Sequence, residues 1–247
     1  MDSYHLEVSP INFSSELESL TKPYQNKSDF FFEEISFNVL YQCFFNVNEN
    51  DGITRCEIFF NNKSNLDTDS FYEQLSSEHH RLTRFTKLQI GYIINNVERI
   101  SNITNEIWFN VEVGILEDLM LDLFLLRFSL KEKGIGLVLE ITERNYFLLN
   151  MSAVNALKAN GFTLAGDDFN KVEIEYFGFI KYFDYIKVED SHNFNPIQFI
   201  KMLKNFSNNV DLRFVIERCS YQYDLTMLEY MGVHYLQGFE YHKPSIL

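Results

Sequence analysis

Short apolar runs that end in polar side chains recur through the second half of the chain. They are Leu137–Glu143, Phe162–Phe169, Tyr185–Glu189, Leu212–Glu217 and Tyr235–Gln237. The polar residues at their ends recur every 20–30 residues, the length of one strand plus a crossover helix of at least ~10–12 residues. This spacing predicts several parallel strands that contribute to one site. Charge in such strands is costly unless a metal ion or a substrate pairs with it.

The chain before these runs predicts a β-hairpin followed by a helix, a strand and a second helix. Two β-rich segments, ISFNVLYQCFFNV from Ile35 and then ITRCEIFF, flank an Asn/Asp/Gly turn at residues 48–52, so the first pair of strands is expected to be antiparallel. Apolar residues at helical spacing predict one long helix over Ser70–Arg99. A strand over Glu106–Val113 and a helix over Leu116–Glu132 follow. Further helices are expected at about residues 147–159, 173–182, 196–205 and 223–231.

The length of 247 residues fits one α/β barrel or two smaller domains. Hydrophobic residues make up 46% of the chain, which indicates a globular protein. No low-complexity tract or Pro/Ser-rich linker follows residue 35, so one domain is the simplest interpretation. We predict an N-terminal extension over residues 1–35 and a barrel domain over residues 36–247.

The formal net charge of −14 argues against a nucleic-acid polymer or an anionic membrane as partner. The chain has no run of about 18 apolar residues that would predict a membrane span. Its start, MDSYHLEVSPINF, lacks the basic and apolar regions of a signal peptide. The cysteines, Cys43, Cys56 and Cys219, are odd in number and have no CxxC spacing, which indicates a reducing compartment. The expected location is therefore the cytoplasm.

The polar residues of the predicted strands define a candidate cation site. In chain order they are Glu57, Asn110, Glu140, Asp167, Asp168, Lys187, Glu217 and Gln237. Carboxylates gathered in one barrel mouth repel one another, and hard divalent cations with oxygen ligands, Mg²⁺ or Mn²⁺, would remove that repulsion. The adjacent Asp167 and Asp168 suit two ions about 3.5–4 Å apart, which hold a hydroxide for in-line displacement at phosphorus. Lys187 is expected to position the attacking water and to offset charge on the phosphoryl oxygens.

Other interpretations of these residues stay open. Any single acid in the set is more often a solvated strand end or a helix cap than a metal ligand. Two carboxylates on barrel strands are also compatible with a retaining glycosidase, although such an enzyme needs neither the lysine nor the double Asp. The chain contains no GxGxxG, Walker, GxSxG or HExxH motif, so the functions that these motifs mark have little support.

Short motifs along the chain resemble those of the EAL-type cyclic di-GMP phosphodiesterases of bacteria. The resemblance covers about residues 36–245, and its segments occur in the family's order. They are Tyr41-Gln42 (YQP), Glu57–Phe59 (EAL), Phe109–Val111 (the vNvS strand), Glu140–Glu143 (EITE), Asp167–Phe169 (DDF), Ile186–Glu189 (IKID), Val215–Glu217 (the start of iAEGVE), and Gln237–Phe239 with Lys243-Pro244 (QGY…KP). The DDF, EITE and QGF segments at these separations are highly specific for the fold.

The resemblance implies a fold, a reaction and roles for individual residues. The implied fold is α/β, a modified TIM (β/α)₈ barrel with an antiparallel first strand. The implied reaction is hydrolysis of cyclic di-GMP to linear pGpG with two Mg²⁺ or Mn²⁺ ions, commonly in a homodimer. The implied metal ligands are Glu57, Asn110, Glu140, Asp167, Asp168 and Glu217. The implied catalytic residues are Lys187, Glu217 and Glu57, the implied substrate-binding residues are Gln42 and Gln237, and the implied loop anchor is Glu143.

Departures from the family pattern lead to an alternative function. Asn61 stands where the EAL-x-R pattern has an arginine for the ligand's phosphate, and an amide cannot make a charge-assisted bidentate contact. The loop after DDF begins with Asn170-Lys171-Val172-Glu173 instead of glycines, which lowers its flexibility. Ser220 and Glu189 replace an acid and an aspartate of the family motifs. The alternative is a catalytically degenerate EAL-like regulator that acts by binding a regulatory protein partner or the nucleotide.

Overall fold

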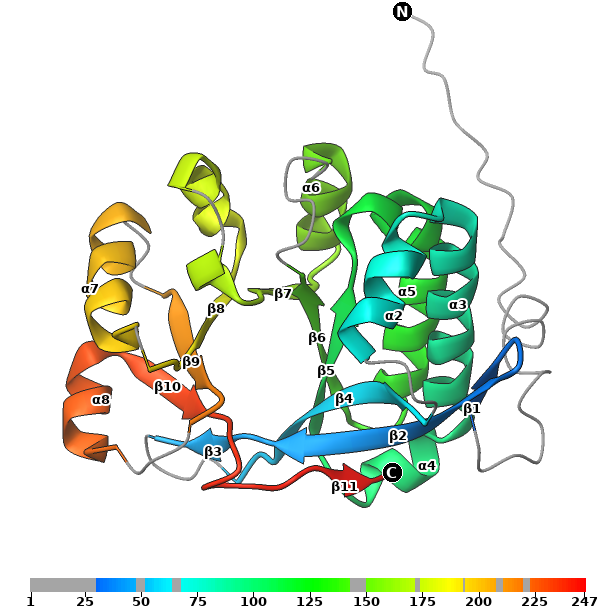
Figure 1. The fold of residues 1–247 in the computed structure, drawn as a ribbon, viewed down its shortest axis with the longest axis horizontal. Helices are drawn as coiled ribbons and strands as arrows, with labels where there is room; N and C mark the ends of the chain where they lie inside the picture. Colours follow the sequence, from blue (N-terminus) through cyan, green and yellow to red (C-terminus); the bar gives the residue numbers. More distant parts are fainter. Residues whose placement is uncertain are drawn as a thin grey trace, which may run out of the picture.

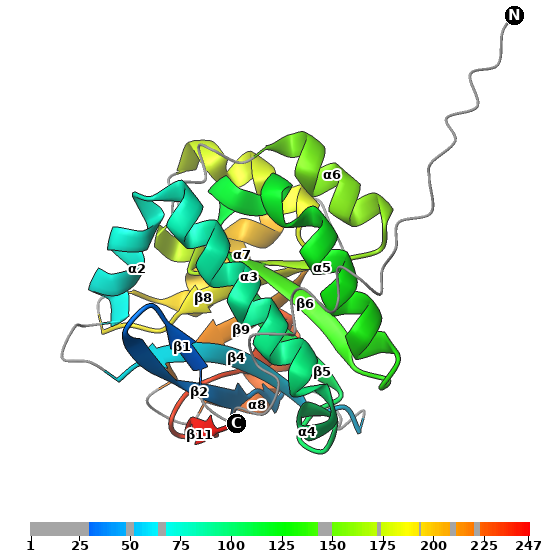
Figure 2. The same cartoon turned by 90° about the vertical axis from the view of Figure 1, so that its right-hand side faces the viewer.

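Residues 30–47, 52–63, 68–142, 150–171, 174–192, 194–207, 211–219 and 223–247 are described in a computed structural model. Their strands form one 11-stranded sheet in the order β1-β2-β4-β5-β6-β7-β8-β9-β10-β3, with β11 paired to β2. The sheet curls into a barrel, and helices cover its outer face (Figures 1 and 2). No helix in these ranges combines the length and the apolar content needed to cross a bilayer.

The elements alternate between strand and helix from β4 onward, as the sequence predicts. The strands are β1 (Phe30–Phe32), β2 (Ile35–Cys43), β3 (Phe45–Asn46), β4 (Arg55–Asn62), β5 (Glu106–Val111), β6 (Gly136–Ile141), β7 (Thr163–Gly166), β8 (Tyr185–Glu189), β9 (Arg213–Glu217), β10 (Val233–Leu236) and β11 (Ser245–Ile246). The α-helices are α2 (Thr68–Ser76), α3 (His79–Asn95), α4 (Val97–Ser101), α5 (Leu116–Lys131), α6 (Met151–Ala159), α7 (Pro196–Ser207) and α8 (Leu225–Met231). The 3₁₀-helices are η2 (Val113–Ile115), η4 (Phe169–Lys171) and η5 (Ile174–Tyr182).

One chain segment closes the barrel. β2 pairs antiparallel with β4, up to the pair Cys43↔Cys56. Immediately afterwards β3 pairs antiparallel with β10, at Tyr235↔Asn46 and Leu236↔Phe45. Strands β4 to β10 are parallel, each to the next. The segment β2–β3 therefore joins the first and last of these strands into the ring of a modified (β/α)₈ barrel with an antiparallel first strand, which confirms the expected fold class.

Two short strands pair with the other edge of β2. β1 does so at Phe30↔Phe37, and β11 at Ile246↔Leu40. The rings of Phe30 and Phe32 are buried and meet the ring of Phe85 on α3 edge-to-face, at centroid distances of 5.7 and 5.0 Å. β1 thus packs into the same core as the barrel although it precedes residue 36. Where the domain begins stays a prediction.

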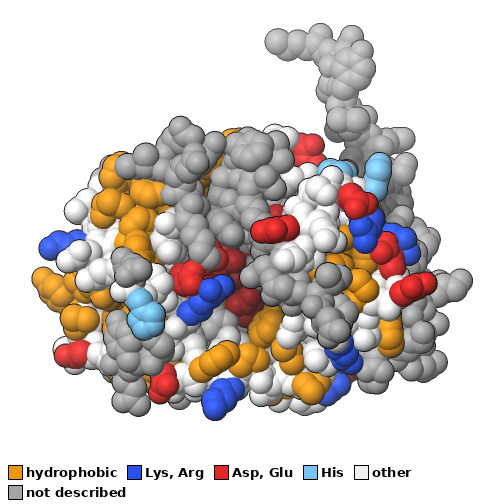
Figure 3. All heavy atoms as spheres, viewed as in Figure 1, with side chains coloured by type: hydrophobic (Ala, Val, Ile, Leu, Met, Phe, Trp, Pro, Cys, Tyr) orange, Lys and Arg blue, Asp and Glu red, His pale blue; other side chains and the backbone are white. Residues whose placement is uncertain are grey.

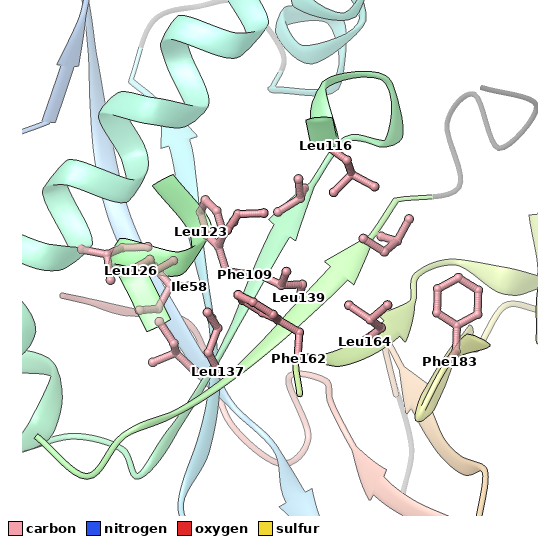
Figure 4. Packing of buried hydrophobic residues seen from close by; sticks show 14 of the residues in the cluster. Ile58, Phe109, Leu116, Leu123, Leu126, Leu137, Leu139, Phe162, Leu164 and Phe183 are labelled. Carbon is pink, nitrogen blue, oxygen red and sulfur yellow. The ribbon is translucent and has the colours of Figure 1, made fainter. Parts of the chain in front are cut away.

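The outer core fills the space between the strands and the surrounding helices. Leu123 and Leu126 of α5 face Ile58 on β4, Phe109 on β5 and Leu139 on β6 (Figure 4). Each of these five side chains is buried. Parallel strands that are covered on both faces bury nearly every residue, so they read as continuous apolar runs without alternation. This burial explains the apolar runs from which the sequence predicts these strands.

The helical region after β4 differs from the single helix predicted over Ser70–Arg99. It consists of α2, α3 and α4, so the prediction of one continuous helix was wrong. The N–H of Glu78 donates to the carbonyl of Leu75 at 2.8 Å, and this three-residue turn ends α2. The helix predicted over residues 173–182 is the 3₁₀-helix η5. Periodicity identifies the buried faces of such segments but does not mark where the hydrogen-bonding pattern changes.

A second, smaller core fills part of the barrel interior, and we call it the inner core. Its buried members come one each from β5 to β10: Trp108, Val138, Ala165, Tyr185, Val215 and Tyr235, with Phe44 packed against them. The ring of Trp108 contacts those of Phe44 and Tyr185, both at a centroid distance of 4.7 Å. Such a layer of side chains from successive strands is how small barrels fill their interior. The inner core gives the barrel mouth a closed apolar base.

Cys43 on β2 and Cys56 on β4 form a disulfide. The two residues are partners in the antiparallel register, and their Cα atoms are 3.9 Å apart. A disulfide is not expected in a reducing compartment, which the odd number of cysteines and their spacing had indicated. Neither the number nor the spacing shows that Cys43 and Cys56 are partners across two strands. Cys219 is a free thiol, and burial raises its pKa to about 12.

We expect reduction of the Cys43–Cys56 disulfide to destabilise the protein. Closing a loop of this length contributes about 3 kcal/mol, largely by constraining the unfolded chain. Urea unfolding with and without dithiothreitol measures the difference. In the Cys43→Ala/Cys56→Ala variant the reductant should change nothing further, and an equal loss in that variant would contradict the assignment.

Candidate functional site

A layer of polar side chains lies next to the inner core, toward the carboxyl ends of the parallel strands. Side chains alternate between the two faces of a strand, so a residue two positions beyond an inner-core residue also points into the barrel. On β5 to β10, or directly after the strand in the case of Asp167 and Gln237, these residues are Asn110, Glu140, Asp167, Lys187, Glu217 and Gln237. Glu57 on β4 and its register partner Gln42 on β2 complete the set. We call these eight residues the polar ring.

The ammonium of Lys187 lies at the centre of the polar ring. Its Nζ is 2.7 Å from Glu217 Oε1, 3.2 Å from Asp167 Oδ1 and 3.3 Å from Glu57 Oε2, and it also contacts Glu140 Oε2. Only 1% of the Lys187 side chain is exposed, and none of the Glu140 side chain. Four carboxylates therefore share one buried cation, and acid groups outnumber it.

Two amide side chains hold the carboxylate of Glu57. Asn110 Nδ2 donates to Glu57 Oε1 at 2.7 Å, and Gln237 Nε2 donates to Glu57 Oε2 at 2.8 Å. Gln237 Nε2 also lies 3.4 Å from Gln42 Oε1, and Gln42 Nε2 donates to the carbonyl of His242 at 2.8 Å. This chain of hydrogen bonds fixes the orientation of Glu57 and ties the ring to the segment after β10.

Burial and charge shift the pKa values of three groups in the ring. Burial raises the pKa of Glu140 well above its usual value, and Glu57 raises it further. Burial also raises the pKa of Glu217 well above its usual value, against the lowering effect of Lys187. Burial alone would lower the pKa of Lys187, but Asp167, Glu140 and the other carboxylates outweigh it and raise that pKa well above its usual value. The ring therefore keeps its ammonium charged and would be stabilised by further positive charge.

Three buried oxygen atoms of the ring have no hydrogen-bond partner. They are Oε1 of Glu140, Oδ1 of Asn110 and Oε1 of Gln237. Glu140 and Asn110 are register partners on β6 and β5, so their side chains are neighbours. Buried acceptors without a partner are costly, and an all-oxygen set of this kind fits a hard divalent cation such as Mg²⁺ or Mn²⁺. Within the described ranges, no group of three or more His, Cys, Asp and Glu side chains is arranged to hold a metal ion as it stands.

Asp168 lies beside the ring, directly after Asp167. Its φ of +42° is in the left-handed region that residues other than glycine seldom adopt. The N–H of Asp167 donates to the carbonyl of Ile141 at 3.0 Å, which fixes the chain just before this turn. The charge of Asp168 contributes to raising the pKa of Glu217. Backbone strain of this kind gathers at functional sites.

Most of the residues predicted from sequence lie together at the barrel mouth. The structure places Gln42, Glu57, Asn110, Glu140, Asp167, Lys187, Glu217 and Gln237 in the polar ring, with Asp168 beside it. Their individual roles as metal ligands, catalytic groups and substrate contacts stay predictions. Glu143, the expected loop anchor, lies outside the described residues.

Two features near the mouth were not predicted from the sequence. His242 accepts from Gln42 through its carbonyl and from the N–H of Cys43 through Nδ1, at 3.2 Å for the latter. Arg218 Nη1 lies 2.7 Å from Glu189 Oε1. Both lie in irregular segments, where no periodicity indicates which way a side chain points. Figure 3 shows acidic side chains in a recess near the middle of one face, with a basic side chain beside them.

Comparison with solved structures relates the fold to EAL domains. No protein-family model and no curated protein matches the sequence. The EAL enzyme Bd1971, in its cAMP- and cyclic-di-GMP-bound form, has a TM-score of 0.66 and 14% identity over 97% of this chain and 68% of that one. The EAL domain of Xanthomonas citri FimX in complex with c-diGMP has a TM-score of 0.65 and 14% identity over 95% of this chain and 94% of that one.

A third structure is the Bacillus subtilis YkuI protein, with an EAL domain, in complex with substrate c-di-GMP and calcium. It has a TM-score of 0.66 and 17% identity over 85% of this chain and 55% of that one. The chain therefore has the fold of EAL domains, and the resemblance drawn from its motifs is confirmed at the level of the fold.

Lys187→Met removes the cation at the centre of the ring and leaves four carboxylates facing one another. We expect the free energy of unfolding to fall by about 3–5 kcal/mol, the usual cost of leaving buried charge unpaired. The folded variant would bind protons on these acids more tightly than the unfolded chain does. The difference in free energy of unfolding between the wild type and this variant should therefore grow from about pH 5 to about pH 8. Urea unfolding at both pH values measures it.

Lys158→Met is the matched control. Lys158 Nζ lies 2.6 Å from Asp184 at the surface, with 33% and 35% of the two side chains exposed. Surface pairs of this kind contribute ~0–1 kcal/mol. Equal losses in the two variants, or a Lys187→Met protein as stable as wild type, would contradict the importance assigned to the buried ammonium.

Proposed function

We propose that this protein hydrolyses one phosphodiester bond of cyclic di-GMP to give linear pGpG, with Mg²⁺ or Mn²⁺ held in the polar ring. The observation that carries the proposal is the ring itself: four carboxylates around one buried lysine, with unpaired buried oxygens beside them. Its place at the carboxyl ends of the barrel strands is where enzymes of this architecture carry their active sites. Cyclic di-GMP is bound in the similar structures of Bd1971, FimX and YkuI.

The residues that would hold two cations are Glu57, Asn110, Glu140, Asp167, Asp168 and Glu217. Their chemistry supports this assignment, because carboxylate and amide oxygens are the preferred ligands of Mg²⁺ and Mn²⁺. Divalent cations bound there would supply charge stabilisation at the phosphoryl group and lower the pKa of water. The structure of YkuI with calcium supports divalent-cation use by a protein of this fold.

The residues of the chain itself would act as follows. Lys187, whose ammonium faces the ring at 2.7–3.3 Å from three of the carboxylates, would donate to the attacking water and to the phosphoryl oxygens. Glu217, whose pKa burial raises well above its usual value, would accept the proton of that water. The water oxygen would then bond to phosphorus as the bond from phosphorus to the ribose oxygen breaks, and the ribose oxygen would leave with the proton that Glu217 had accepted. Gln237 and Gln42 would bind the substrate while Gln237 and Asn110 keep Glu57 in place.

A second candidate function is that of a regulator that binds cyclic di-GMP or a protein without hydrolysis. The observation that favours it is the ammonium of Lys187, which contacts four of the five carboxylates that are assigned to the cations. Asn61 on β4 carries no charge to bind a phosphate, and Asn170 Oδ1 accepts from the N–H of Glu189 at 2.9 Å, which fastens the segment after β7 to β8. The homodimer, the regulatory protein partner and the cytoplasmic location stay predictions.

The glycosidase interpretation has less support than either of these. A glycosidase places its two carboxyl groups on opposite sides of a sugar ring. Here the carboxylates of Glu57, Glu140, Asp167 and Glu217 all converge on the ammonium of Lys187. Oxygens of Glu57, Asp167 and Glu217 lie 2.7–3.3 Å from Lys187 Nζ. We therefore propose phosphodiester chemistry over glycoside chemistry.

Glu140→Gln tests the proposed reaction. The purified protein with Mn²⁺ should release pGpG from cyclic di-GMP, and Glu140→Gln should lower kcat by about 10²-fold or more, because it removes a charge that acts in the transition state. Glu229→Gln changes an exposed glutamate on α8 in the same way and should leave kcat as in wild type. Product separation by chromatography measures the rates.

Absence of pGpG at high wild-type concentration would overturn hydrolysis. Calorimetry with cyclic di-GMP would then distinguish a regulator that binds the nucleotide from one that binds only a protein partner. Equal rates for Glu140→Gln and wild type would show that the reaction does not use the ring.

A further inference from the structure

Arg218 occupies an unusual place at the edge of the barrel mouth. It directly follows Glu217, the last residue of β9, and 64% of its side chain is exposed. Its φ is +52°, in the left-handed region where glycine is the usual residue. A residue with a side chain costs about 1–3 kcal/mol in such a conformation, and strain of this kind persists mainly at functional sites. We infer that Arg218 binds a phosphate group of the cyclic dinucleotide and thereby sets the affinity of the site.

The direction of the guanidinium supports this role. Its Nη1 lies 2.7 Å from Oε1 of Glu189, whose side chain is only 12% exposed. Glu189 comes two residues after Lys187 on β8 and therefore points to the same inner face of the barrel, one layer closer to the mouth. The guanidinium thus reaches from the end of β9 to a carboxylate at the carboxyl end of β8, beside the barrel mouth. The hydrogen bond from the N–H of Glu189 to Asn170 holds that strand end in place.

The charge of the site favours a cation at this level. A chain with a net charge of −14 and an acid-lined mouth repels an anionic phosphodiester. Lys187 lies deep in the ring, with 1% of its side chain exposed and carboxylates around it. Arg218 is accessible from solvent, and a guanidinium presents a planar set of N–H donors that matches phosphate oxygens in two-point contacts. It can therefore meet a phosphate as the ligand enters.

A purely structural role predicts different behaviour. If Arg218 served only to hold Glu189, the strain at its φ would be offset by the ion pair, and removing the guanidinium would destabilise the protein. A pair with one partner 64% exposed contributes little to stability. Glycine at this position would also relieve the backbone strain. In Arg218→Gly the stability of the protein should therefore stay the same or rise, while its affinity for the cyclic dinucleotide falls.

The inference rests on the proposed function, and Arg218→Gly tests it. With Mn²⁺ and cyclic di-GMP, this variant should raise KM about 10-fold while kcat stays within about twofold of wild type, because the contact is made equally before and during the reaction. Its melting temperature should equal or exceed that of wild type. Arg218→Lys keeps a point charge without the two-point geometry and should lie between the two.

Glu189→Gln is the matched variant for the ion pair. It frees the guanidinium from its carboxylate, so KM should stay at the wild-type value or fall. If Glu189→Gln instead raises KM as much as Arg218→Gly does, Arg218 acts only by positioning Glu189 and the inference is overturned. An unchanged KM in Arg218→Gly, with active wild type, overturns the inference alone. Wild type that neither hydrolyses nor binds cyclic di-GMP overturns both the inference and the proposed function.

Discussion

The contact between one buried ammonium and four carboxylates is the constraint on which the barrel mouth depends. Lys187 and Glu140 are almost completely removed from water, and neither charge would be stable there alone. Because the pKa of Lys187 is raised by the acids around it, the ammonium stays charged over the whole range in which the protein is expected to work. The stability of the barrel and the chemistry of its site are therefore two consequences of one arrangement.

That arrangement exists because strand register stacks two layers inside the barrel. Trp108 and its neighbours form the apolar layer, and six residues of the polar ring follow two positions later along β5 to β10. The antiparallel segment β2–β3 completes both layers, since it supplies Phe44 to one and Gln42 to the other. The Cys43–Cys56 disulfide fastens β2 to β4 directly beside the pair Gln42↔Glu57. The amide network around Glu57 is held in place by this closure.

The sequence allowed much of this to be predicted, because two simple patterns carry it. Continuous apolar runs identify buried parallel strands, and polar residues at the ends of these runs identify the mouth, so Glu140, Lys187 and Glu217 could be found without any structure. Gln42 could not be found in this way, because it precedes its inner-core neighbour on an antiparallel strand and only the family motif pointed to it.

Other features depend on three-dimensional relations that a linear pattern does not contain. The Cys43–Cys56 disulfide follows from register across a turn, and the ends of α2 and α3 follow from a change in hydrogen bonding. The left-handed backbones of Asp168 and Arg218 have no signature in residue type, since neither residue is glycine. The unpaired oxygens of Asn110 and Glu140 likewise appear only once the side chains are placed. Composition and periodicity therefore predict where the site lies, whereas its unmet charge and hydrogen-bonding capacity are visible only in the structure.

The proposed chemistry depends on the polar ring being a binding site for divalent cations. The most direct test is anomalous diffraction at the manganese absorption edge, from crystals of the protein grown with Mn²⁺. We expect anomalous peaks in contact with Oε1 of Glu140 and Oδ1 of Asn110, and their absence in Glu140→Gln crystals. A map without an anomalous peak in the ring, with Lys187 still in contact with all four carboxylates, would contradict it.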